Sequence, residues 1–164
     1  MQAFAHHLDA IAAASTNKTV KNAAAAVLSN DGFDRWLYAC DNPYGKLGLP
    51  ITLANEYGAW ILTYTAKGYQ KSDPVHAHCR ANTDPIMWDA TVGWETAESA
   101  VKAFMKDVAA HGFGSGVAIP LHEFEESKGL LSLTHPAPLA EARPLFAEAL
   151  PRLVRIGQTM HRTI

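Results

Sequence analysis

The 164-residue chain is long enough for one domain with a buried core, and its 48% hydrophobic and 18% charged residues exclude a disordered protein. A formal net charge of −2 gives no basic surface of the kind that binds nucleic acid. With two cysteines, no basic leader and no apolar run of membrane-spanning length, the sequence predicts a cytoplasmic protein with reduced thiols and no membrane segment.

The first third of the chain predicts two helices followed by two strands. Residues 2–14 carry an apolar stripe at helical spacing, and a second helix follows with Asn17 or Thr19 as its N-cap. The aromatic-rich segment 33–40 and the short segment 51–54 predict strands.

The middle of the chain predicts an amphipathic helix that is rich in aromatic residues. Tyr57, Trp60, Ile61 and Tyr64 recur at positions i, i+3, i+4 and i+7, and Gly68 ends this helix. One apolar face therefore carries three aromatic rings.

Two further helices and a loop follow. Asp73 and Pro74 have the residue types of a helix N-cap and first position. Residues 83–93, which include Trp88, predict a loop, and residues 95–111 predict a helix.

The C-terminal part predicts a hairpin and a long helix. Segments 116–121 and 129–134 read as two strands joined by a charged turn, and Pro120 needs an edge or bulge position because it has no N–H donor. Residues 137–164 predict a helix with two internal prolines as kinks. This order favours a mainly antiparallel sheet with helices on both faces.

A few side chains suggest a binding pocket, and each also has a structural interpretation. Trp60 and Tyr64 share a helix face and are either core residues or polar handles for a ligand. Asp73 is a helix N-cap whose second oxygen can accept a ligand N–H, and Trp88 is either a core plug or a pocket wall. Ser132 alternates with two leucines, so it points to the opposite sheet face and needs a hydrogen-bond partner there.

The residues that could suggest a metal site or a catalytic site do not form one. His76, His78 and Cys79 are close in sequence, but positions i and i+2 of a helix point in different directions and no second cluster completes a zinc site. The sequence has no nucleophile elbow, phosphate-binding loop or H-E-x-x-H motif. We therefore expect no metal and no enzymatic activity.

A series of spaced residues that spans about half of the chain carries a family resemblance: Trp60, Tyr64, Tyr69, Asp73-Pro74-Val75, Cys79, Pro85, Trp88-Asp89, Gly112, Gly116, Pro120-Leu121-His122, Gly129 and Ser132-Leu133. In this order and spacing, the series resembles the autoinducer-binding domain of LuxR-type quorum-sensing regulators. The segment GFDRWLYA around the first predicted strand is also similar to that family.

The resemblance implies a fold, a ligand and a regulatory role for residues 1–164. The fold would be of the α/β class, an α-β-α sandwich with a central, mainly antiparallel sheet of about five strands. The ligand would be an acyl-homoserine lactone or a related autoinducer, held between the sheet and one helical layer, and no cofactor is implied. The intact regulator would be a homodimer that controls transcription through a C-terminal helix-turn-helix domain, and this chain ends near where the linker to that domain would begin.

The resemblance also implies roles for individual residues. Trp60 corresponds to the tryptophan that donates to the lactone carbonyl, Asp73 to the aspartate that accepts the amide N–H, and Ser132 to a position that can bond the amide carbonyl. The other implied ligand-binding positions are the pocket-lining residues Tyr64, Val75, Trp88, Phe104 and Phe113 and the acyl-chain contacts Leu37, Ala39 and Leu130.

Glu56 and Tyr57 depart from the family pattern, which usually has a tyrosine four residues before the tryptophan. If Glu56 occupies that position, it shares a helix face with Trp60 and adds a second carboxyl group to the pocket, which would change the ligand class. Alternatively, Glu56 turns to solvent and Tyr57 fills the place through a one-residue shift.

Two other functions remain as alternatives. The chain could be a ligand-independent dimerising module that inhibits full-length regulators, or a small hydrolase using Asp73 and a histidine, which no nucleophile motif supports. The homodimer is also predicted from an apolar stripe that would otherwise be exposed on the last helix, formed by Leu139, Phe146, Leu150 and Leu153.

Overall fold

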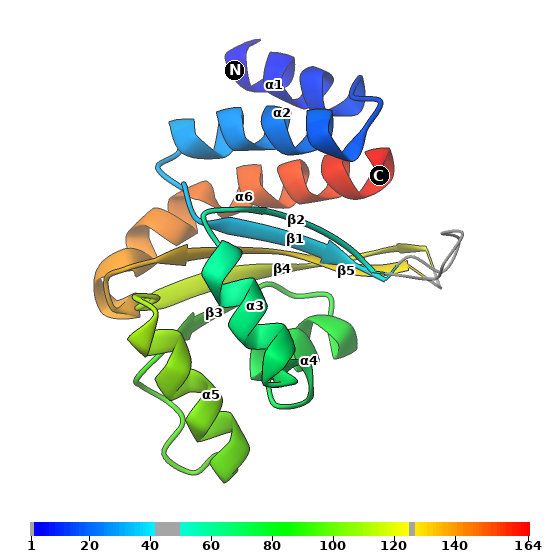
Figure 1. The fold of residues 1–164 in the computed structure, drawn as a ribbon. Helices are drawn as coiled ribbons and strands as arrows, with labels where there is room; N and C mark the ends of the chain where they lie inside the picture. Colours follow the sequence, from blue (N-terminus) through cyan, green and yellow to red (C-terminus); the bar gives the residue numbers. More distant parts are fainter. Residues whose placement is uncertain (1, 42–49, 125–126) are drawn as a thin grey trace.

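A five-stranded sheet lies between two groups of helices in the computed structural model, which describes residues 2–41, 50–124 and 127–164 (Figure 1). All strand pairings are antiparallel, in the order β2-β1-β5-β4-β3. This confirms the predicted α-β-α sandwich. The strands are β1 (Trp36–Cys40), β2 (Ile51–Asn55), β3 (Ile86–Asp89), β4 (Ser115–Phe124) and β5 (Ser127–His135).

The helices divide into two layers, one above and one below the sheet in the view of Figure 1. The upper layer contains α1 (Gln2–Ala12), α2 (Asn17–Asn30) and α6 (Leu139–Thr163). The lower layer contains α3 (Gly58–Ala66), the short 3-10 helix η1 (Tyr69–Lys71), α4 (Pro74–Ala81) and α5 (Ser99–Ala110). Each helix that the sequence predicts is present.

The N-cap of α2 differs from the prediction. Thr16, rather than Asn17 or Thr19, is the cap, and its hydroxyl accepts a hydrogen bond from the Thr19 backbone N–H at 3.2 Å. The Thr19 hydroxyl accepts in turn from the Thr16 N–H at 3.1 Å. This reciprocal pair is a capping box in which threonine replaces the usual glutamate, so the prediction placed the cap one or three residues too late.

The segment around Trp88 is a strand, so its prediction as a loop is wrong. Residues Ile86–Asp89 form β3, which pairs with β4 from Ala118 to Ser115 and supplies the fifth strand. A strand of four residues at the sheet edge is too short for a recognisable alternation in sequence. Pro120 lies two residues beyond the last β3 pair, so none of the described strands pairs with that side of β4 there, consistent with its expected edge position.

The long helix α6 packs its apolar stripe on the sheet, which corrects the expectation of an exposed stripe. Phe146 and Leu153 are fully buried, and the helix continues through both prolines. Gly157 allows close packing, since a Cβ there would lie 3.1 Å from a methyl group of Leu121.

None of the helices in the described residues is both long and apolar enough to cross a membrane.

The main hydrophobic core therefore lies between the sheet and the upper helices. It is built from aliphatic side chains together with a few large rings. Its largest fully buried members are Ile11, Leu28, Phe33, Trp36, Tyr38, Ile119, Leu121, Leu131, Leu133, Phe146 and Leu153. The opposite face of the sheet carries a second cluster, and the candidate site lies there.

Candidate functional site

A cavity of about 420 Å³ lies on the lower face of the sheet, where α3, α4 and α5 face β1 and β5. This volume is within the range of small-molecule binding sites. Its lining is mostly apolar and aromatic, with a few polar groups. The lining contains twelve of the residues expected from the resemblance: Leu37, Ala39, Tyr57, Trp60, Tyr64, Asp73, Val75, Trp88, Phe104, Phe113, Leu130 and Ser132.

Strand alternation forms the floor of the cavity. In β5, Leu130, Ser132 and Thr134 line the cavity, whereas Leu131 and Leu133 belong to the core on the other face. This confirms the predicted orientation of Ser132. The neighbouring strand adds Leu37, which pairs with Ser132, so a polar group lies among apolar ones on this face.

Asp73 is placed at the cavity wall by its role as N-cap of α4. Its Oδ1 accepts the backbone N–H groups of Val75 at 2.8 Å and His76 at 3.1 Å, which satisfies the exposed start of the helix. The Tyr64 hydroxyl donates to Oδ2 at 2.9 Å. A carboxylate has about four acceptor positions, so Oδ2 retains one for a ligand donor.

The enclosed position of Asp73 affects its ionisation. Burial raises the pKa of the carboxyl group above its usual value, although the hydrogen bonds from His76, Tyr64 and Val75 oppose this rise. Burial, together with the nearby carboxylate, also raises the pKa of Tyr64, so its hydroxyl stays protonated and donates. A ligand N–H would stabilise the ionised form of Asp73 by adding a further donor.

Trp60 lies at the centre of an aromatic cluster at the cavity wall. Its indole contacts His111 edge-on with ring centroids 4.8 Å apart, and it stacks on Tyr69 at 5.9 Å. Phe104 and Phe113 pack against it from α5 and the segment after it, at 5.9 Å and 5.8 Å. None of the described residues accepts a hydrogen bond from Trp60 Nε1, so this donor remains available for a ligand.

Trp88 forms a flat wall of the cavity. A Cβ at Gly116 would lie 2.4 Å from the Trp88 ring, so the indole can lie across β4 only because residue 116 is glycine. Trp88 Nε1 is buried and has no hydrogen-bond partner among the residues that the structure describes. In this conformation the ring therefore acts as an apolar surface, as in the pocket-wall interpretation.

The comparisons with known proteins agree with this geometry. The family model described as autoinducer binding domain matches residues 16–164. The chain belongs to the autoinducer-binding domain family. These are the signal-binding, non-enzymatic domains of LuxR-type quorum-sensing regulators. None of the curated proteins matches the chain.

Solved structures of LuxR-family proteins share the fold at low sequence identity. CepR2 of Burkholderia cenocepacia, an N-acylhomoserine lactone dependent transcription factor, is 20% identical with a TM-score of 0.78, covering 99% of this chain and 93% of that one. SdiA of Escherichia coli is 18% identical with a TM-score of 0.70, covering 99% and 68%. A complex of SdiA with octanoyl-rac-glycerol is 19% identical with a TM-score of 0.69, covering 98% and 66%.

Within the autoinducer-binding domain, Glu56 lies outside the cavity and Tyr57 takes the expected place. The expectation that Glu56 shares a helix face with Trp60 is wrong, because α3 begins at Gly58 and Glu56 is an exposed residue with φ of 56°. Tyr57 is buried, stacks on Phe113 at 5.1 Å, and donates its hydroxyl to Thr134 at 3.0 Å. The structure therefore follows the one-residue shift.

Several lining residues were not predicted. Ile61 and Cys79 follow expected residues by one helical turn, and Thr134 follows Ser132 by one strand repeat, so spacing alone would have found them. Burial raises the pKa of the Cys79 thiol to about 12, which leaves it protonated and unreactive. The other unpredicted members include Met105 and Val108 of α5 and the more polar Thr52, Gln70, His76, Arg80, Asp41 and Lys128.

Proposed function

We propose that the cavity binds an amphiphilic autoinducer with a compact polar head group and an acyl chain, of the acyl-homoserine-lactone type. The observation that carries this proposal is the placement of Asp73, an enclosed carboxyl group with one free acceptor position at the wall of a largely apolar cavity. A buried acceptor of this kind favours a ligand with an N–H or O–H donor.

The remaining polar groups suit the rest of such a head group. Trp60 offers an unpaired N–H from α3, and Ser132 offers a hydroxyl from the sheet, so a ligand with two carbonyl groups can be bound from two sides. The apolar floor formed by Leu37, Ala39 and Leu130 suits the acyl chain. SdiA has been solved with a glycerol ester, so the head-group class is itself part of the test.

Asp73→Asn separates ligand binding from helix capping. Asparagine is as good an N-cap as aspartate, so α4 should remain intact, while the charged acceptor is lost. We expect N-octanoyl-homoserine lactone to bind the parent protein and to bind Asp73→Asn about 10- to 100-fold more weakly by calorimetry. Equal affinities for the two proteins would contradict the role of Asp73.

The choice of probe distinguishes the ligand class. Octanoyl-rac-glycerol has the same chain length but a hydroxyl head group in place of the amide and lactone. Tighter binding of the glycerol ester than of the lactone would replace the proposed ligand class, and binding of neither compound would favour the ligand-independent dimerising module instead.

The regulatory part of the proposal rests on the family alone. We propose that the intact protein is a homodimer in the cytoplasm and controls transcription through a DNA-binding domain outside this chain. The apolar stripe of α6 no longer supports the dimer, because it packs on the sheet of its own domain. Sedimentation of this chain, with and without bound ligand, tests dimerisation directly, and a monomer at high micromolar concentration in both states would count against it.

A further inference from the structure

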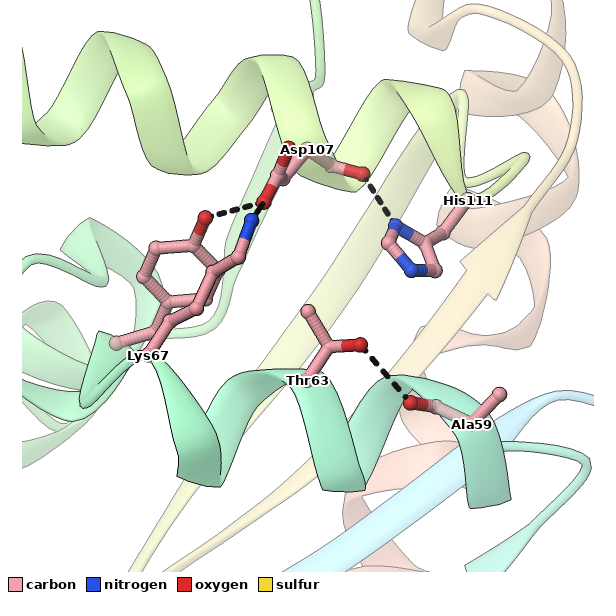
Figure 2. A network of polar contacts seen from close by, with 6 residues as sticks. Ala59, Thr63, Lys67, Asp107 and His111 are labelled. Carbon is pink, nitrogen blue, oxygen red and sulfur yellow. Dashed lines mark hydrogen bonds and ion pairs between the residues drawn. The ribbon is translucent and has the colours of Figure 1, made fainter.

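A polar network that includes Lys67, Asp107 and His111, drawn in Figure 2, lies next to the aromatic rings that pack around Trp60. Two of the rings that contact the indole, those of Tyr69 and His111, are both bonded to Asp107 of α5. Neither ring lines the cavity, and neither does Asp107. Any effect of this network on a ligand in the cavity would therefore have to pass through Trp60.

Asp107 uses its side chain and its backbone for different contacts. The carboxylate accepts from the Tyr69 hydroxyl and, at 2.5 Å, from the Lys67 ammonium group beyond the end of α3. The backbone carbonyl accepts from His111 Nδ1 at 2.7 Å. The Lys67 ammonium group also lies 5.7 Å from the centre of the Tyr69 ring, so it contacts both partners of the hydrogen bond.

We propose that Asp107 is a positioning residue for head-group recognition: by fixing Tyr69 against Trp60, it holds the indole N–H in the orientation that a ligand carbonyl requires. This inference rests on the proposed function, because it assigns Trp60 the contact with the head group. The stacked Tyr69 ring restricts rotation of the indole, and the Asp107 carboxylate restricts rotation of Tyr69.

The exposure of Lys67 and Asp107 argues against a large contribution of the network to folding stability. The side chains of Lys67 and Asp107 are 52% and 28% exposed, and an exposed ion pair contributes little to folding. The two bonding partners nevertheless keep the pKa of Asp107 below its usual value, so the carboxylate is charged at neutral pH. Ordering a side chain before the ligand arrives improves affinity, because that ordering no longer opposes binding.

The test compares two ligands on one variant. Asp107→Ala removes the carboxylate from a half-buried helical position, and alanine has the highest helix propensity. The probes are N-octanoyl-homoserine lactone and N-cyclopentyl octanamide, which keeps the amide and chain but lacks both lactone oxygens. We expect the variant to bind the lactone about three- to tenfold more weakly and the cyclopentyl amide with unchanged affinity, because only the lactone offers Trp60 an acceptor.

Asp31 provides a matched control on the other face of the sheet. Its carboxylate pairs with Arg152 through bonds of 3.0 Å and 2.9 Å and is similarly half-buried. Asp31→Ala should therefore leave both affinities unchanged. Tyr69→Phe, which removes only the hydroxyl, should reproduce the selective loss and decides the question if Asp107→Ala does not fold.

The outcomes separate this inference from the proposed function. If the parent protein binds the lactone and Asp107→Ala weakens both probes equally, Asp107 has a general structural role and the inference is overturned. Unchanged affinity for the lactone in both Asp107→Ala and Tyr69→Phe would overturn it as well, while the proposed function would stand. Absence of lactone binding by the parent protein would overturn both.

Discussion

The two faces of the sheet are packed in different ways, although the same strands supply both. Above the sheet, α6 lies over the strands, and mainly aliphatic side chains fill the interface between them. Below it, three shorter helices enclose a cavity walled by aromatic rings. The main core and the candidate binding cavity therefore lie on opposite faces of one sheet.

The difference follows from what each layer offers to the sheet. The 25-residue α6 presents a continuous apolar stripe, including the close approach at Gly157. The lower helices are 9, 8 and 12 residues long and meet the sheet mainly through large rings. These rings pack against one another at centroid distances of 5 to 6 Å, a range that is favourable for aromatic pairs.

Leu131 and Leu130 allow the sharpest test of this comparison, since they are adjacent residues on opposite faces. Leu131 is fully buried in the core, so Leu131→Ala should lower the free energy of unfolding by about 3–5 kcal/mol. Leu130 borders the cavity and is slightly more exposed, so Leu130→Ala should cost about 2 kcal/mol. Urea unfolding of both variants measures the two values.

Ligand binding should show the opposite order. Leu130→Ala enlarges the cavity floor and should alter affinity for acyl chains, whereas Leu131→Ala should leave affinity unchanged at temperatures where it is folded. Similar stability losses for the two variants, or similar effects on affinity, would mean that the two faces do not divide these roles.

Asp89 connects the two faces, and its replacement should have an intermediate effect. Its Oδ2 accepts the Leu139 N–H at the start of α6 at 2.8 Å, and its Oδ1 accepts the N–H groups of Thr91 at 2.8 Å and Val92 at 3.1 Å. Because these bonds join the edge strand β3 to the upper helix, Asp89→Ala should cost about 2–3 kcal/mol in urea unfolding. Thr91→Val, which removes only the hydrogen bond from the Thr91 hydroxyl to Asp89, is the milder control.

The same residue gives the stability a pH dependence. Burial disfavours the charged form of Asp89, but the bonds from Leu139, Thr91 and Val92 outweigh it and hold the pKa below the usual value. A carboxyl group whose pKa is lowered by folding stabilises the protein at pH values above its unfolded pKa, and this contribution is lost as the pH falls through the folded pKa. As the pH is lowered, the free energy of unfolding of Asp89→Ala should therefore fall less steeply than that of the parent protein. Equal slopes of the free energy against pH for the two proteins would contradict this.

The periodic parts of the fold were predictable from sequence. Long helices such as α6 and the β4-β5 hairpin follow from residue spacing, because one face of each element is buried along its whole length. The edge strand β3 was missed because its four residues are ordered by pairing with β4 rather than by their own pattern. The capping box at Thr16 was missed because threonine replaces the residue that usually completes it.

The candidate site was predictable mainly through the family resemblance. Spacing placed Trp60 and Tyr64 on one face, and alternation placed Ser132 on the cavity side, but neither pattern indicates that a cavity exists. The hydrogen bond from Tyr69 to Asp107 joins residues 38 positions apart, and only the packing of α5 beside η1 brings them together. Long-range side-chain contacts of this kind leave no local pattern in sequence.

Replacing Glu56 should have the smallest effect on stability, and it tests whether this residue lies outside the binding cavity. It is the one non-glycine residue with positive φ among those described, and its exposed side chain does not line the cavity. Glycine adopts this backbone conformation without the steric cost of a Cβ, but it also gains more freedom in the unfolded chain. Glu56→Gly should therefore raise the free energy of unfolding by about 0.5 kcal/mol and leave lactone affinity unchanged. Reduced affinity in a protein of equal or greater stability would place Glu56 in the binding site and contradict the assignment of Tyr57 to that position.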